Sequence, residues 1–183
     1  MELRDAIYGR HSTRSFTEGV TPTQDEITAM LDAATHAPNA CNFQSWRIFV
    51  ITDPDVRARF AECGACAPWV ASAPVIFVMA ADPTQLAERF GQNKAEMFVI
   101  QDTALAAQNL LLCAHDMGYG GCVIGAFRDA LVRQILPLPE HFLLTMLLPI
   151  GKASEPTATR PRKPLDEVIT FIGAKESSKQ IGI

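Results

Sequence analysis

The stretch AEMFVIQDTALAAQNLLLCAHDM, residues 95–117, carries the longest helical pattern in the chain. If this stretch is a helix, its apolar residues cover much of the circumference, and a helix of that kind is normally buried. We therefore expect it to lie at the centre of the molecule. Gly118 follows directly and predicts where the helix ends, because glycine accepts the left-handed conformation found after helix C-termini.

Shorter patterns on either side of this stretch predict a mixture of helices and strands. Helices are expected at 2–9, 23–37 and 128–136 and after Asp53-Pro54, and strands at 46–52, 74–82, 120–127 and 141–151. The second helix begins with the capping-box spacing of Thr23 and Glu26. No repeat or break in composition divides the chain. Residues 1–183 are therefore expected to form one α+β domain, in which helices cover a modest sheet.

The composition limits the classes of partner and location. The 183 residues are 48% hydrophobic with a formal net charge of -4, which argues against disorder and against a broad basic face for nucleic acid. Residues 69–81 form the longest apolar run, which is too short to cross a bilayer. Glu2 and Arg4 interrupt any signal-peptide pattern, and the five scattered cysteines suit a reducing compartment. We expect a cytoplasmic protein that binds neither nucleic acid nor a membrane.

Positive charge gathers at two places in this acidic chain. RHSTRSF, residues 10–16, contains two arginines and a histidine with hydroxyl residues between them, and TRPRKP, residues 159–164, contains Arg160 and Arg162. Guanidinium groups match phosphate oxygens in a bidentate manner, and the hydroxyl groups can add donors. Each cluster taken alone is equally compatible with a solvated surface turn, and sequence spacing does not show whether the two clusters meet.

Two further stretches could approach a flat ligand. APNACNFQSW, residues 37–46, offers amide side chains that can read the edge of a heteroaromatic ring, although proline and asparagine are also ordinary turn residues. GYGGCVIG, residues 118–125, allows close backbone approach, or is simply a helix stop and a tight turn. It is not a dinucleotide fingerprint, because Val123 stands where a third glycine is needed.

The sequence gives little support for a metal site or for a side-chain nucleophile. CGAC, residues 63–66, has the spacing of a metal or redox pair, but no second pair or neighbouring histidine completes a zinc site. The four histidines show no metal-binding spacing, and neither a G-x-S-x-G nor a P-loop sequence is present. We expect no metal and no side-chain nucleophile.

The order of these stretches resembles the FMN-dependent nitroreductase family over nearly the whole chain. The resemblance rests on RHSTRSF, HAPNACNFQSWRIFVI, WVASAPVIFVMAAD, QDTALAAQNLLLCAHDMGYGGCVIGAF and PIGKASEPTATRPRKPLDEV. It implies an α+β fold with a central, mostly antiparallel sheet flanked by helices. It also implies an intertwined homodimer in which extended segments of each chain wrap the other, with one FMN per subunit at the interface.

The resemblance also assigns roles to residues. Arg10, Ser12 and Arg14 would hold the FMN phosphate and ribityl chain, and Arg160 and Arg162 would close on the phosphate. His11 stands where the family commonly has arginine and could contribute through its backbone or ring. The residues expected from the other subunit, facing the ring, are Pro38, Asn39, Ala40, Asn42 and Gln44. Val123, Ile124 and Gly125 would lie beside the isoalloxazine, with a backbone amide near Gly125 or Ala126 directed at flavin N5, the reactive centre.

The implied activity is an NADH- or NADPH-dependent oxidoreductase that passes electrons from flavin N5 to nitroaromatic, quinone or related acceptors in a ping-pong sequence. The same family resemblance admits dehalogenation, dehydrogenation, flavin fragmentation, or an FMN sensor or store without turnover. The chain is shorter than many similar proteins around residues 82–97. In similar proteins this region covers the flavin face, so Phe90 and Met97 are expected to lie at the substrate pocket, and a small lid predicts an open site with broad substrate tolerance.

Overall fold

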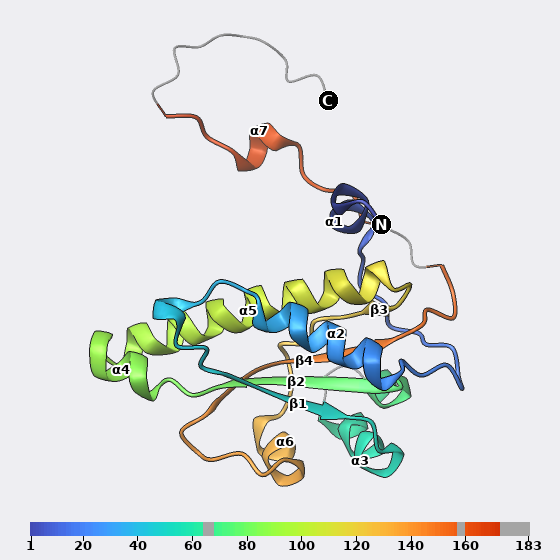
Figure 1. Ribbon diagram of the computed structural model, residues 1–183, viewed down its shortest axis with the longest axis horizontal. Helices are drawn as coiled ribbons and strands as arrows, with labels where there is room; N and C mark the ends of the chain where they lie inside the picture. The colour runs from blue at the N-terminus through green and yellow to red at the C-terminus, as the bar shows by residue number, and fades with distance from the viewer. Residues whose placement is uncertain (64–67, 157–159, 173–183) are drawn as a thin grey trace.

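The computed structural model describes residues 1–63, 68–156 and 160–172. Its centre is an antiparallel sheet in the order β1-β2-β4-β3 (Figure 1). The strands are β1 (Trp46–Ile51), β2 (Val75–Ala81), β3 (Gly120–Gly121) and β4 (Leu143–Gly151). Every residue of β2 is buried, since the strand pairs on both edges and is covered on both faces. The predicted α+β class with an antiparallel sheet is confirmed.

One face of the sheet is covered by two helices, α2 (Gln24–Thr35) and α5 (Gln92–Asp116) (Figure 1). The central helix predicted from residues 95–117 is confirmed as α5, and Gly118 follows it with a φ of 82°. By length and composition, α5 is the one helix among the described residues that could cross a membrane. Its packing against α2 and the sheet accounts for that apolarity.

The opposite face carries shorter elements, and local capping signals locate their ends. They are α3 (Pro54–Arg59), η2 (Phe60–Glu62), η3 (Pro68–Ser72) and α6 (Asp129–Ile135). The Asp53 side chain accepts a hydrogen bond of 2.9 Å from the Val56 N–H at the start of α3. On the first face, Thr23 and Glu26 form the predicted capping box at the start of α2. The helices expected near these residues are therefore confirmed.

Two elements differ from expectation. The strand predicted at 120–127 is wrong in length: only β3 pairs as a strand, and Ile124 adds an isolated bridge to Leu147. The regular pairing covers only the two glycines, whose backbone lies close to β4, and it stops at Cys122 although the apolar residues continue. Helix α4 (Thr84–Phe90) was not predicted, because its seven residues follow an Asp-Pro pair that looks like a loop. It packs against the first turns of α5.

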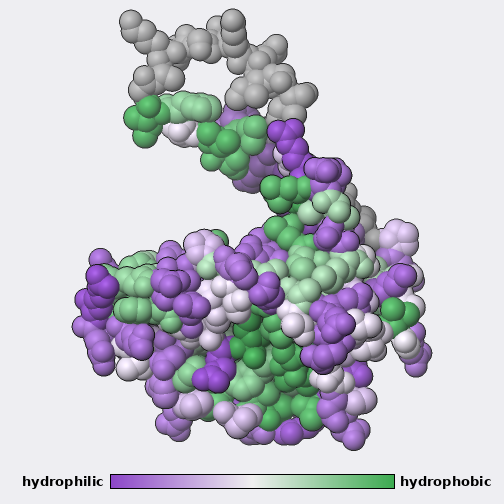
Figure 2. All heavy atoms as spheres, in the orientation of Figure 1, coloured by the Kyte–Doolittle hydropathy of each residue, from purple (hydrophilic) through white to green (hydrophobic). Residues whose placement is uncertain are grey.

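The C-terminal end of the described chain projects from this body, whereas the N-terminal end contacts it, since Ala6 is buried and the Met1 amino group lies 2.7 Å from Oδ1 of Asp116. Helix α1 (Leu3–Gly9) lies above the C-terminal end of α5, and α7 (Leu165–Val168) lies on a segment that projects beyond it (Figure 1). Figure 2 shows hydrophobic side chains beside hydrophilic ones on this segment, and the large apolar side chains are uncovered, with Phe171 71% and Ile172 96% exposed. Among the described residues it therefore does not pack on the chain's own core.

Candidate functional site

The segment 10–16 runs along the free edge of the sheet, beside β3. The Thr13 N–H donates to the Gly121 carbonyl at 3.0 Å, and Ser12 forms a parallel bridge with Gly121. Further along, Phe16 forms an antiparallel bridge with Ala153 after β4. The segment is therefore an extended addition to the sheet, and main-chain hydrogen bonds hold its backbone, together with the bond between the Ser15 and Ser154 hydroxyl groups.

Two polar atoms of this segment are buried without a partner among the described residues, Nε of Arg10 and Oγ1 of Thr13. Leaving such groups unsatisfied costs about 1–3 kcal/mol each, so they mark a place where a ligand is expected. Ser12 is half-buried and Arg14 is exposed. Nδ1 of His11 lies 2.9 Å from the Gly9 carbonyl oxygen, which turns this ring back toward α1.

Arg10 and Thr13 line a cavity of about 240 Å³ between the edge segment and the C-terminal end of α5. The cavity is also lined by Met1, His11, Leu111, His115, Gly118, Tyr119, Gly120, Gly121 and Ala153. Burial lowers the pKa of His115, and the nearby His11 and Arg10 lower it further. His115 is therefore mostly neutral at neutral pH, whereas the Arg10 guanidinium stays charged. The Met1 ammonium also lines the cavity, but it is paired with Asp116 at 2.7 Å.

Glycines let the edge segment approach β3 closely. A Cβ on Gly120 would lie 2.1 Å from Oγ1 of Thr13, and one on Gly121 would lie 2.3 Å from Cδ1 of Ile150. Beyond them the loop opens: apart from its chain neighbours, no atom of the described residues lies within 4 Å of a Cβ placed on Gly125, and Val123 is 50% exposed. Ile124 is instead buried, and it exchanges backbone hydrogen bonds of 2.9 and 3.0 Å with Leu147.

The predicted amide-bearing residues lie in a constrained loop, residues 38–44, which includes the short helix η1 (Ala40–Asn42). Three residues that are not glycine adopt left-handed backbone conformations, Cys41 at φ 56°, Asn42 at 57° and Gln44 at 51°. The Asn39 Oδ1 accepts from the Gln44 N–H at 2.9 Å, so the Asn39 amide closes the loop. Asn42 and Gln44 are exposed. Such strain is typical of functional sites.

A buried carboxylate on the neighbouring helix α5 holds this loop through hydrogen bonds. Asp102, on α5, is 4% exposed, and both its carboxylate oxygens accept from the Ala40 N–H, at 3.0 and 3.1 Å. Burial raises the pKa of Asp102, and the Ala40 N–H partly offsets that effect. Sequence reasoning missed this residue, although an isolated acid inside the apolar run FVIQDTALAA is a recognisable signal.

Within one chain the two parts of the expected site are far apart. Asp102, below the amide loop, and His115, at the cavity, are separated by about 20 Å along α5 at the rise of an α-helix. The expected pocket residues belong to the loop's side: Phe90 contacts Phe98 edge-on, with ring centroids 5.4 Å apart, and Phe98 packs in the cluster that includes Ala40. Phe90 is 38% and Met97 47% exposed.

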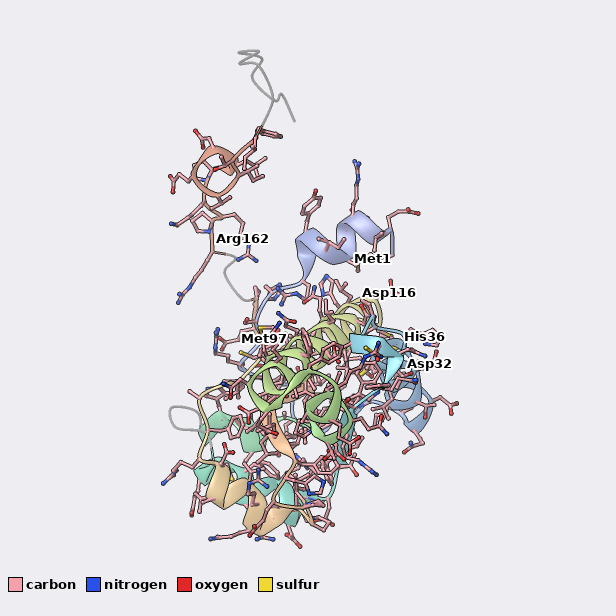
Figure 3. All side chains as sticks on the ribbon, turned by 90° about the vertical axis from the view of Figure 1, so that its left-hand side faces the viewer. Met1, Asp32, His36, Met97, Asp116 and Arg162 are labelled. Atoms are coloured by element: carbon pink, nitrogen blue, oxygen red, sulfur yellow. The ribbon has the colours of Figure 1, made fainter. Side chains whose placement is uncertain are left out.

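The second arginine cluster is also separate from the first within one chain. Arg160 and Arg162 are exposed, and Figure 3 shows Arg162 on the projecting segment, above the body that contains Met97 and Asp32. The structure gives no contact between these arginines and Arg10 within the described ranges. Cys66, the second cysteine of CGAC, lies outside the described residues, whereas the Cys63 thiol is buried and its pKa is raised by that burial.

These features define an α+β protein with a buried basic cavity at one sheet edge and a strained, amide-bearing loop at the other end of its central helix. The sequence profile of the Nitroreductase family matches residues 7–66 and 62–152, so the chain belongs to that family. The resemblance found in the sequence is therefore confirmed.

Individual relatives agree with this assignment. A Bacillus subtilis protein named FMN reductase (NADPH) is 32% identical over 177 residues, covering 90% of this chain and 71% of its own length. A Staphylococcus aureus protein named NADPH-dependent oxidoreductase is 27% identical over 185 residues, covering 91% and 73%. The structure of a Bacillus subtilis nitroreductase matches with a TM-score of 0.82 at 29% identity, covering 92% of this chain and 73% of that one. A structure from Exiguobacterium sibiricum that contains FMN shares the fold, with a TM-score of 0.83 at 20% identity, covering 94% and 98%.

Proposed function

We propose that this protein is an FMN-dependent NAD(P)H oxidoreductase that reduces nitroaromatic, quinone or related conjugated acceptors. The observation that carries the proposal is the buried Nε of Arg10, which has no partner in the described residues and lines a cavity beside β3. An unpaired guanidinium N–H in a cavity calls for an anion. The relatives named FMN reductase (NADPH) and NADPH-dependent oxidoreductase support a flavin phosphate as that anion.

The residues present fit FMN in both chemical parts. A phosphate dianion suits Arg10 together with the Ser12 hydroxyl and Arg14, all carried on one extended segment. A flat ring suits the open backbone at Gly125, where nothing fills the space that a side chain would take. When bound, FMN supplies an N5 centre that accepts and donates hydride.

We further propose that the complete site needs two copies of the chain. Along α5, Asp102 lies about 14 Å from Leu111 and about 20 Å from His115, the two α5 residues that line the Arg10 cavity. We therefore infer that the amide loop and the cavity of one chain do not serve the same flavin. The apolar side chains of the projecting segment, such as Phe171, are exposed and need a surface to cover them. A homodimer in which this segment wraps the partner satisfies both requirements. It also brings Arg160 and Arg162 toward a phosphate held by a partner's Arg10.

The roles left for side chains are binding, orientation and control of access. Arg10 and Arg14 neutralise the phosphate, and the exposed amides of Asn42 and Gln44 orient the edge of the ring. Phe90 and Met97 are each more than a third exposed, and in this proposal they form an open apolar rim beside the ring. An open apolar rim selects flat, conjugated acceptors by shape, which supports broad acceptor tolerance.

The proposal is tested with purified protein under anaerobic conditions. We expect a yellow protein with flavin absorption that bleaches on addition of NADH or NADPH and recovers on addition of a nitroaromatic or a quinone. Bound flavin that neither nucleotide reduces would instead indicate an FMN store. Protein that gains no flavin when reconstituted with FMN would overturn the proposal. A single tightly preferred acceptor in a screen would contradict the open site.

A further inference from the structure

We propose that Asp102 is a positioning residue for the amide loop, and that its carboxylate fixes the conformation in which residues 38–44 present Asn42 and Gln44. This inference rests on the proposed function, because the loop matters for activity only if it faces a flavin ring. The contact itself, between Asp102 and the Ala40 N–H, is present in the single chain.

The loop needs a cap from outside itself. Asn39 occupies the N-cap position of η1, yet it makes no side-chain capping bond there. Its Oδ1 is used at the other end of the loop by the Gln44 N–H, and its Nδ2 donates to the Ala37 carbonyl at 3.3 Å. The Ala40 N–H is therefore left without a local acceptor, and Asp102, 62 residues further along the chain, supplies one. The carboxylate acts as an N-cap donated by another element.

The conformation that this bond holds is unfavourable on its own. Cys41, Asn42 and Gln44 are all left-handed without being glycine, and such a cluster persists only when its surroundings fix it. The Gln44 Nε2 donates to the Asn42 carbonyl at 3.1 Å, which is a bond within the loop. The Asp102–Ala40 contact is what ties the start of η1 to the central helix.

A stability role does not explain a carboxylate at this position. Asp102 is 4% exposed and makes no ion pair with a cation in the described ranges. An unpaired buried charge normally destabilises a fold, and departures of this kind concentrate where function requires them. The raised pKa of Asp102 agrees with that cost. What the carboxylate provides is two acceptor oxygens for the Ala40 N–H.

The same helix also holds the chain just before the loop. Asn109, about two turns further along α5, donates from Nδ2 to the Ala33 carbonyl near the end of α2 at 3.1 Å. One face of α5 thus anchors both the end of α2 and the loop that follows it. Asp102 is the anchor next to the amides that are expected to face the ring.

The test uses full-length protein and compares four variants. Asp102→Asn keeps an acceptor oxygen, and Asp102→Leu keeps the approximate size but removes it. Ala40→Pro removes the donor at the first position of η1, where proline is tolerated, and the extended backbone of the preceding Asn39 (φ -151°, ψ 159°) suits a residue before proline. Thr103→Val is the matched control, because Thr103 is equally buried but bonds only within α5, to Val99 and Ile100.

Hydrogen exchange of the backbone amides of residues 38–45, measured without FMN, reports directly on how firmly the loop conformation is held. We expect Asp102→Leu and Ala40→Pro each to raise this exchange and the FMN dissociation constant about tenfold, the equivalent of one lost buried hydrogen bond. The double variant should be no worse than either single one. Asp102→Asn and Thr103→Val should stay close to wild type in both measurements.

Several outcomes would overturn the inference. Unchanged loop exchange in Asp102→Leu, or additive effects in the double variant, would show that the Asp102–Ala40 bond does not fix the loop. If Asp102→Leu fails to fold, the comparison of Asp102→Asn with Ala40→Pro decides, and equal loosening by both would contradict the proposal. Failure of wild-type protein to bind FMN would refute the proposed function while leaving the exchange result interpretable.

Discussion

The edge segment 10–16 and the amide loop 38–44 are held in opposite ways. In the edge segment, backbone pairing with Gly121 and Ala153 fixes the chain, and Nε of Arg10 and Oγ1 of Thr13 have no hydrogen-bond partner among the described residues. In the loop, the side chains of Asn39 and Asp102 fix the backbone by accepting hydrogen bonds from the Gln44 and Ala40 N–H groups. Side-chain deletions should therefore weaken binding in the first segment and disturb conformation in the second.

Removing the Arg10 side chain from the edge segment should have the largest effect, and the effect should be on FMN binding. We expect Arg10→Ala to weaken FMN binding by about 2–5 kcal/mol, because a phosphate would lose its buried charge partner. Stability should change little, since the backbone pairing remains. Fluorescence titration with FMN measures the effect, and Arg4→Ala on the exposed face of α1 is the matched control. Equal affinity in Arg10→Ala and wild type would show that the phosphate binds elsewhere.

Polar substitution in the projecting segment tests whether a second copy completes the site. Phe171→Ser should weaken dimerisation by about 2 kcal/mol for each subunit, because a side chain that is 71% exposed in one chain would lose its covering surface. Sedimentation equilibrium measures the dissociation constant. Gln101→Ser, an exposed change on α5, serves as a control for general surface effects. A wild-type protein that is monomeric at all concentrations would contradict the shared site.

Adding a methyl group at β3 should break the contact that positions the edge segment. We expect Gly120→Ala to destabilise the fold by about 1–3 kcal/mol, because the new Cβ would overlap the Thr13 side chain. Gly125→Ala is the control, since no atom lies within 4 Å of its Cβ position. Denaturant unfolding compares the two variants. Similar stabilities would mean that the edge segment does not depend on the close approach at Gly120.

The smallest expected effect is the pH dependence of the free energy of unfolding that comes from Asp102, the residue that holds the amide loop. Burial raises the folded-state pKa of Asp102 above the ordinary value of 3.8, so ionisation is harder in the folded protein than in the unfolded one. Its contribution to stability is therefore lost as pH rises from about 4 through the folded pKa. Asp102→Asn should remove this decline and gain on wild type toward neutral pH in unfolding experiments. A constant difference across that range would contradict the raised pKa.

Elements governed by local signals could be predicted from the sequence. The apolar circumference of residues 95–117 indicated α5, the apolar run at 74–82 indicated β2, and the Thr23–Glu26 spacing indicated the start of α2. Each signal lies within a few residues of its consequence. Helix α4 was missed because seven residues give too short a pattern to separate a helix from a loop.

The candidate site could be predicted only as separate stretches. The sequence indicated Arg10 and the amides at 38–44, but not that Arg10 has an unpaired buried nitrogen or that Gln44 is left-handed. Those properties depend on packing between distant segments. The Asp102–Ala40 contact spans 62 residues, and no spacing rule connects an acid inside a helix with an amide that far away.

Subunit complementation tests the central claim most directly, namely that the Arg10 cavity of one chain and the amide loop of another form one flavin site. Arg10→Ala and Asn42→Ala chains would be co-expressed with different tags, and flavin content measured in the mixed dimers. In mixed dimers isolated through both tags, about half of the sites should recover, because each heterodimer has one intact site of two. No recovery above the two parent variants would contradict the account.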